Sequence, residues 1–207
     1  MKREENISFF TIAIKNLLVK FHANPFYFFY EEDVKTYLLS QLSNMFDEEE
    51  FSVRHDFVNK LSVSKIKSIP IKSEYPYVRG KISKYDISLI EAIGDNHYDL
   101  PSSIVIELKL GSAIYDRCSN FKDDLRKLIF YRNNAETNNS LGISLFLNQS
   151  SLTEKEIKSW LMDFHFIISE IRNEDLVLVD NNICAIIASV DNRIFFLQNI
   201  SSSEAKI

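Results

Sequence analysis

Residues 102–113 read SSIVIELKLGSA and place a glutamate and a lysine inside an otherwise apolar segment. In a β-strand successive side chains point to opposite faces, so the isoleucines and leucines at even positions share one face. Glu107 and Lys109 share the other face, about 7 Å apart. A buried Glu–Lys pair is a poor source of stability, because the cost of desolvating both charges can exceed their attraction. The stretch therefore predicts a buried strand whose charged pair has another role.

The composition is that of an ordinary globular chain. The protein has 207 residues, of which 45% are hydrophobic and 26% are charged, and its net charge is −5. This length suits one domain. Two cysteines, Cys118 and Cys184, make no disulfide framework, so we expect reduced thiols in a cytoplasmic protein. No segment reaches the roughly 18 uninterrupted apolar residues of a membrane span, and Lys15 interrupts the apolar run near the N-terminus, so no membrane association is expected.

Alternating helical and strand patterns predict an α/β fold with a mixed central sheet flanked by helices. Helices are expected at about 5–21, 27–46, 115–134 and 151–167. Strands are expected at about 51–58, 66–78, 84–92, 103–110, 141–149, 175–180, 183–191 and 193–198. Asp191-Asn192 is expected to turn a hairpin between the last two strands. In the first helix, an apolar stripe is formed by Phe10, Ile14, Leu17, Leu18 and Phe21.

Charge is unevenly distributed along the chain. From Lys60 to Lys84 there are seven basic residues and one acid, which is a charge of +6 and leaves −11 for the remainder (−5 − 6 = −11). The overall acidity argues mildly against nucleic-acid binding, whereas the basic segment could face phosphates. The alternative is a solvated face carrying edge-strand lysines.

A second acid precedes the charged strand. The segment YDISLI (85–90) is followed by a turn that leads back into the strand of Glu107, so a hairpin would bring Asp86 close to Glu107. Two carboxylates about 4 Å apart repel by roughly 4 kcal/mol at an effective dielectric of 20. They would share a proton or a divalent cation, and such hard oxygen ligands suit Mg²⁺ or Mn²⁺. Lys109 would then orient water or neutralise charge on a phosphate.

A third acid, Glu31, opens the helical segment YEEDVKTYLLSQL (30–42). On a helical wheel Glu31 falls within the apolar face of this helix, whereas Asp33 points to the other side. We therefore expect Glu31 to point inward at the sheet. The alternative is a first-turn glutamate that is favoured only by the helix dipole.

This ordered set of residues resembles the PD-(D/E)xK nuclease superfamily, which has the restriction-endonuclease-like fold. The motif reads YD at 85–86 and IELKLG at 106–111. The α-β-β-β-α-β core order of the family is similar to the order expected over residues 27–147. The resemblance implies a single domain over 1–207, in which 1–26 is an N-terminal helical extension and 148–207 a C-terminal α/β elaboration.

Two further segments carry the resemblance. SEYPY (73–77) resembles the first core strand of many members, and FKDDLRKLIFY (121–131) resembles the helix that follows the motif strand. One departure is that Tyr85, and not proline, precedes Asp86. That position varies in the family and puts little in doubt.

The resemblance implies a Mg²⁺- or Mn²⁺-dependent nuclease that hydrolyses phosphodiester bonds, with DNA the expected substrate, in restriction, phage defence, repair or recombination. The implied catalytic residues are Asp86, Glu107, Lys109 and Glu31. The implied metal ligands are Asp86, Glu107, the Leu108 backbone carbonyl and Glu31. Candidate nucleic-acid contacts are Lys72, Arg79, Lys81, Lys84 and Lys127, and candidate auxiliary residues are Asp124 and Tyr131.

A second interpretation is a catalytically inactive nuclease-fold protein that acts as a binding or regulatory subunit, as a homodimer or with a protein partner. The acidity and the lack of a separate DNA-reading module favour it, whereas the complete acid–acid–lysine set favours the enzyme. The two interpretations differ in whether Glu31, Asp86, Glu107 and Lys109 converge. The four histidines show no metal-ligand spacing, which argues against a zinc nuclease.

Overall fold

The computed structural model describes residues 2–57, 60–76, 84–90, 102–111, 116–134, 141–180 and 182–199. Its helices are α1 (Lys2–Ala23), α2 (Glu31–Ser43), α3 (Asp116–Asn134), α4 (Glu154–Trp160) and the short 3₁₀ helix η1 (Asn173–Asp175). Its strands are β1 (Glu49–Phe57), β2 (Lys60–Ser68), β3 (Ile71–Pro76), β4 (Lys84–Ile90), β5 (Ser102–Gly111), β6 (Leu141–Asn148), β7 (Phe166–Ile171), β8 (Ile183–Ser189) and β9 (Ile194–Asn199).

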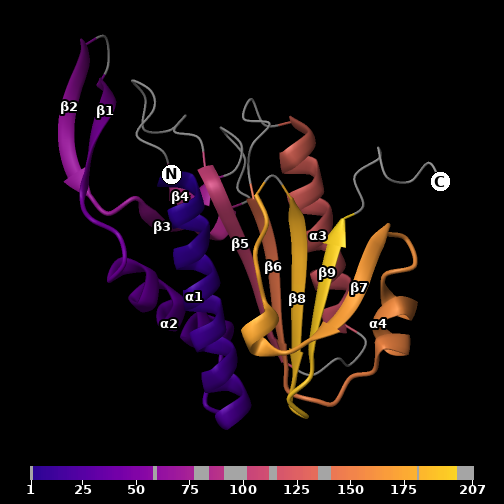
Figure 1. Cartoon of the computed structure of the whole chain (residues 1–207). Helices are drawn as coiled ribbons and strands as arrows, with labels where there is room; N and C mark the ends of the chain where they lie inside the picture. Colours follow the sequence, from indigo (N-terminus) through magenta and orange to yellow (C-terminus); the bar gives the residue numbers. More distant parts are fainter. Residues whose placement is uncertain are drawn as a thin grey trace.

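One mixed sheet organises the molecule, which confirms the α/β class. Its seven strands lie in the order β3-β4-β5-β6-β8-β9-β7. The β3, β4 and β5 strands are antiparallel, β6 and β8 continue parallel to β5, and β9 and β7 are antiparallel again. The β1–β2 hairpin forms a separate two-stranded sheet at one side of the molecule (Figure 1).

The two faces of β5 pack against different helices, as its period of two predicts. Ile104, Ile106 and Leu108 belong to the core cluster that also contains the buried residues of α1 and α2. Val105 on the opposite face packs with Leu128 of α3. Glu107 and Lys109 share the face of Val105, so they are directed toward the α3 side of the sheet.

Helix α1 is part of the main core. The predicted stripe of Phe10, Ile14, Leu17, Leu18 and Phe21 is completely buried. These side chains pack in one cluster with residues of β5, β6 and β8. Within the described ranges, no helix combines the length and the apolar character that a membrane crossing requires.

The helix expected over 151–167 is wrong in its second half. Helix α4 ends at Trp160, and strand β7 follows from Phe166. Thr153 caps α4 through a capping box with Glu156. After a short turn, half-buried and exposed residues alternate from Phe166 to Ser169 of β7, which pairs with β9 at the edge of the sheet.

Two strand predictions also differ from the structure. The strand expected over 66–78 is two strands, β2 and β3, because Pro70 lacks the N–H that a continuous ladder needs. The strand expected over 175–180 is absent: this segment begins as η1 and continues without a strand assignment. Its buried Leu176 and Leu178 instead join the core cluster of α1.

We predict that Leu17→Ala lowers the free energy of unfolding by about 2–5 kcal/mol, since Leu17 is fully buried. Val19→Ala on the exposed face of the same helix is the control and should change it by less than about 0.5 kcal/mol. Urea denaturation measures both values. Equal effects of the two substitutions would show that α1 does not depend on this stripe.

Candidate active site

Strands β4 and β5 bring Asp86 and Glu107 to facing positions and then separate. Ile87 pairs with Ile106, and Asp86 lies one residue before this pair and Glu107 one residue after it. The Oδ2 atom of Asp86 accepts a hydrogen bond of 2.8 Å from the backbone N–H of Leu108. The Asp86 side chain thus replaces a backbone acceptor for β5 at the point where the β4–β5 pairing ends. Strand β4 remains paired with β3 as far as Lys84.

Glu107 is a buried carboxylate with a lysine partner. Its Oε1 lies 2.5 Å from the Nζ of Lys127 on α3, and that Nζ also donates to the backbone carbonyl of Lys84. Burial raises the pKa of Glu107 to about 8, although Lys127 opposes the shift. The nearby charges of Asp86 and Asp124 raise this pKa further. Burial and the neighbouring acids therefore favour the protonated form of Glu107, whereas Lys127 favours the charged form.

Lys109 links the helices on the two sides of the sheet. Its Nζ lies 3.5 Å from Glu31 Oε1 at the start of α2 and 3.4 Å from Asp124 Oδ2 on α3. Burial lowers the pKa of Lys109, but Asp124, Glu31 and Asp86 together outweigh burial and raise it. Burial raises the pKa of Asp124 to about 6, against the opposing effect of Lys109. Burial also raises the pKa of Glu31.

Asp86 is the common neighbour of these groups. Its charge contributes to the pKa of each of the following residues: Glu31, Lys35, Glu107, Lys109 and Asp124. We call the four acids Glu31, Asp86, Glu107 and Asp124, with Lys109 and Lys127, the carboxylate cluster. The structure thus places these residues near one another, but Glu31, Asp86 and Glu107 do not converge within one metal coordination sphere among the described residues. Glu107 and Lys109 take different partners in this cluster.

The donor set decides which cation could be held. In the described ranges, no group of three His, Cys, Asp or Glu side chains is arranged to hold a metal ion. Mg²⁺ commonly uses only one or two protein carboxylates and keeps several waters. Asp86 and Glu107 face each other across two strands and fit that pattern, because a cation would relieve the repulsion that helps to raise the pKa of Glu107.

The other two predicted metal ligands are Glu31 and the backbone carbonyl of Leu108. The carboxylate of Glu31 already has a partner, the ammonium group of Lys109. Leu108 contributes its N–H to Asp86, and a role for its carbonyl stays a prediction. The described residues therefore offer no cage of three acids, and a cation held by Asp86 and Glu107 alone stays a prediction.

The predicted nucleic-acid contacts are spread over several elements. Lys72 is half-buried, donates to Ser68 Oγ and lies 6.0 Å from the ring centroid of Phe51, so it packs at the base of the β1–β2 hairpin. Lys84 is exposed at the start of β4. Arg79 and Lys81 lie outside the described residues. The phosphate-binding role of these residues stays a prediction.

Helix α3 supplies more of the cluster than the sequence indicated. Asp124, predicted as auxiliary, contacts Lys109, and Lys127, predicted as a nucleic-acid contact, contacts Glu107. The sequence feature that could have indicated a shared role is the spacing of three residues between Asp124 and Lys127, which places both on one face of the helix. Tyr131 lies on α3, and its side chain is outside the described residues.

The ion pairs of Lys35, a buried lysine whose two acidic partners are exposed, were not predicted. Its Nζ lies 2.7 Å from both Glu32 and Glu74, which joins α2 to β3 beside the cluster. These partners raise the pKa of Lys35 above its usual value, although burial opposes them. Glu74 has a φ of 53°, a left-handed conformation that is uncommon for a glutamate. The pair thus holds the start of α2 close to β3.

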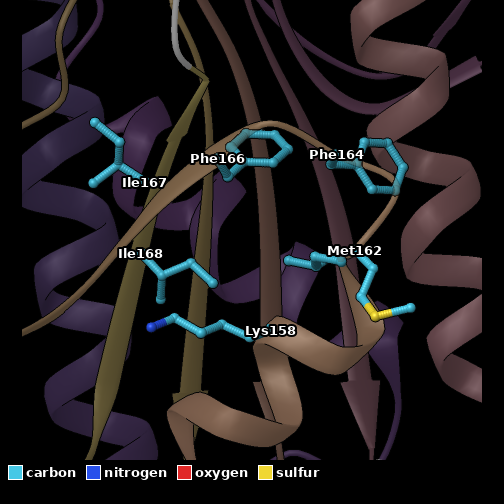
Figure 2. A pocket seen from close by; sticks show the side chains of 7 residues that line it. Lys158, Met162, Phe164, Phe166, Ile167 and Ile168 are labelled. Atoms are coloured by element: carbon cyan, nitrogen blue, oxygen red, sulfur yellow. The ribbon is translucent and has the colours of Figure 1, made fainter. Parts of the chain in front are cut away.

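A hollow of about 390 Å³ lies elsewhere, between α4 and β7 (Figure 2). Its lining includes Met162, Phe164, Phe166 and Ile168, and Lys158 carries its single charge. This lining contains no acid. The hollow is therefore not the place of the acid and lysine chemistry.

Comparison of the chain with protein-family models, curated proteins and solved structures finds no match. Functional inference therefore rests on the geometry of the carboxylate cluster. Its central observation is the facing pair of Asp86 and Glu107 with Lys109 on the same strand.

We predict that Glu107→Gln stabilises the protein at pH 8. The raised pKa means that the folded state binds more protons than the unfolded state between about pH 4.5 and pH 8, so stability falls as the pH rises through this window. A neutral amide removes this loss, and the free energy of unfolding at pH 8 should rise by at least about 1 kcal/mol, which corresponds to a pKa shift of one unit. Denaturation at several pH values measures the effect.

Asp124→Asn is the matched control for this prediction. Its pKa is raised only to about 6, so its effect on the slope of stability against pH should be confined to the range below about pH 6. A Glu107→Gln variant that is less stable than the wild type at pH 8 would show that the charged carboxylate stabilises the fold.

Proposed function

We propose that the protein is a metal-dependent nuclease of the PD-(D/E)xK class, with a restriction-endonuclease-like fold, that hydrolyses phosphodiester bonds in DNA. Restriction, phage defence and repair are the processes in which it would act. The observation that carries the proposal is the facing pair Asp86 and Glu107, with Lys109 two residues along β5. The order α2-β3-β4-β5-α3-β6, with these strands adjacent in the sheet, supports the fold assignment.

In the proposed mechanism Asp86 and Glu107 would hold the cation. The chemistry that Mg²⁺ would supply there is that of a Lewis acid for the scissile phosphate and a lower pKa for bound water. Lys109 holds its proton at Nζ and places a positive charge beside the carboxylate pair, where it stabilises charge that develops on the phosphate. Glu31 and Asp124 act as positioning residues, because they hold this Nζ from two different helices.

Glu107 has to change partners for this chemistry. Its pKa of about 8 and its contact with Lys127 mean that cation binding must displace a proton and compete with an ammonium group. Metal binding should therefore release protons and become weaker as the pH falls below about 8.

The second candidate function is a nuclease-fold protein without catalysis that binds a partner. One observation favours it: both lysines of the cluster already have acidic partners, as they would in a purely structural network. Such a network is a poor stabiliser in itself, since desolvation opposes it. Cation binding separates the two functions, because a structural network would keep Lys127 on Glu107.

We predict that the wild type cleaves plasmid or oligonucleotide DNA in the presence of Mg²⁺ or Mn²⁺, and that Asp86→Ala abolishes cleavage. Lys109→Ala should lower kcat by about 100-fold or more, which is the usual effect of removing a group that stabilises the transition state. Calorimetry should show that Asp86→Ala weakens metal binding much more than Lys109→Ala does. Gel assays with matched protein concentrations measure the cleavage rates.

Lys158→Ala on α4 is the matched lysine control and should cleave at the wild-type rate, because Lys158 pairs only with Glu154 of its own helix in the described contacts. Absence of both cleavage and Mn²⁺ binding in the wild type would contradict the nuclease and leave the non-catalytic function. Cleavage that is unchanged in Lys109→Ala would remove Lys109 from the mechanism.

A further inference from the structure

The connection between α1 and α2 exposes an unusual number of aromatic side chains. Within the sequence PFYFFY (25–30), Phe26 is 61%, Phe29 is 79% and Tyr30 is 74% exposed, and Tyr27 is also exposed. Phe28 alone is buried. We call residues 25–30 the aromatic segment. Exposed apolar groups that are contiguous, rather than scattered singly, mark binding surfaces.

The main chain of the aromatic segment is held in place. The Nε2 of Gln149 donates to the carbonyls of Pro25 and Phe28, at 3.1 Å each. The Oδ2 of Asp33 accepts from the N–H groups of Phe29 and Tyr30, at 2.9 Å each.

The buried ring of Phe28 packs edge-on against Tyr37, with 5.8 Å between ring centroids. Together with these hydrogen bonds, it anchors the segment to the core. The exposed rings are therefore presented by a fixed backbone, which lowers the entropy cost of binding.

The segment lies next to the carboxylate cluster. Tyr30 directly precedes Glu31, so their Cα atoms are about 3.8 Å apart, and Glu31 contacts Lys109. Gln149 follows β6, and its N–H donates to the carbonyl of Gly111 at the end of β5. The α1–α2 connection and the carboxyl end of β6 lie at the same end of the sheet, at the bottom of the view (Figure 1). A chain bound at the cluster would thus pass the exposed rings.

We propose that the aromatic segment is a stacking platform for unpaired bases, so that the nuclease takes single-stranded DNA or an unpaired strand end as substrate. This inference rests on the proposed nuclease function. Every base has a flat π-face that stacks on an aromatic ring, whatever the sequence. In a duplex these faces are covered by neighbouring bases, so the platform selects unpaired strands.

The charges near the segment are of both signs, because the first turn of α2 that follows it carries Glu31, Glu32 and Asp33. The Nζ of Lys20 lies 4.0 Å from the ring centroid of Tyr27, so a cation accompanies the rings. Combined aromatic and cationic groups are the usual means of binding single strands.

The test measures binding without cleavage. A fluorescent 20-nucleotide oligo-dT and the same strand in a duplex with oligo-dA are titrated with the full chain in EDTA, and anisotropy gives the affinities. We expect the wild type to prefer the single strand. The double variant Phe29→Ala/Tyr30→Ala should lose about 10-fold or more of single-strand affinity, because each stacked base contributes about 1–3 kcal/mol, and its duplex affinity should not change.

Two controls accompany this measurement. Met162→Ala/Ile167→Ala removes two exposed apolar side chains from another surface and should leave the affinity unchanged. Tyr30→Phe keeps the ring and should bind like the wild type. In Tyr30→Trp, oligo-dT should quench the fluorescence of the introduced indole. The wild type, whose single tryptophan is Trp160, gives the reference fluorescence.

The outcomes separate the two proposals. Equal single-strand affinity of wild type and Phe29→Ala/Tyr30→Ala, or no binding of oligo-dT by the wild type, would overturn the platform even if the protein cleaves DNA. Suppose that Phe29→Ala/Tyr30→Ala binds oligo-dT more weakly than the wild type, and that the wild type never cleaves DNA with Mg²⁺ or Mn²⁺. These two results together would support the stacking platform and contradict the nuclease function. Circular dichroism of each variant establishes that it is folded.

Discussion

The carboxylate of Glu107 imposes the main constraint on this structure. It lies in β5, between β4 and β6 in a seven-stranded sheet, and only 4% of its surface is exposed. A buried charge of this kind must be paired, or it must take up a proton. Lys127 of α3 supplies a partner, and the raised pKa shows that this pairing does not fully offset burial. Divalent cations are attracted to carboxylates in this condition, which is why the proposed function begins at this residue.

The surrounding elements follow from the same requirement. The side chain of Asp86 accepts a hydrogen bond from the N–H of Leu108, at the point beside Glu107 where the β4–β5 ladder ends. Lys109 then extends between Glu31 of α2 and Asp124 of α3, and its ammonium joins the two helical layers. The aromatic segment is the direct continuation of this arrangement, because it ends at the residue before Glu31. The carboxylate cluster and the aromatic segment thus lie together at one end of the sheet.

The sequence predicted the elements whose pattern is local. The period of two in β5, the stripe of α1 and the hairpin at Asp191-Asn192 are all confirmed, the last by the β8–β9 pairing and by a φ of 65° at Asn192. The inward direction of Glu31 followed from the helical wheel, and its carboxylate does reach Lys109. Strand β7 was missed because the apolar residues after Trp160 also fit a helix, and the β9 partner that decides between the two patterns is distant in sequence.

The ion pairs of the cluster could not be predicted in the same way. Which acid meets Lys109 and which lysine meets Glu107 depends on how α3 crosses β5 and β6, and no local pattern encodes that crossing. The sequence placed Asp124 and Lys127 on one helix edge but gave them separate roles. The exposed rings next to Glu31 were visible in the sequence, but only burial distinguishes Phe29 and Tyr30 from the core residue Phe28.

The most direct test of the central claim is the anomalous diffraction of crystals soaked in Mn²⁺ at pH 8. We expect one strong Mn²⁺ peak between the carboxylates of Asp86 and Glu107, with the Lys127 ammonium moved away from Glu107. A structure at saturating Mn²⁺ with no peak at this position, and with Lys127 still paired to Glu107, would contradict the account and identify the carboxylate cluster as a structural network.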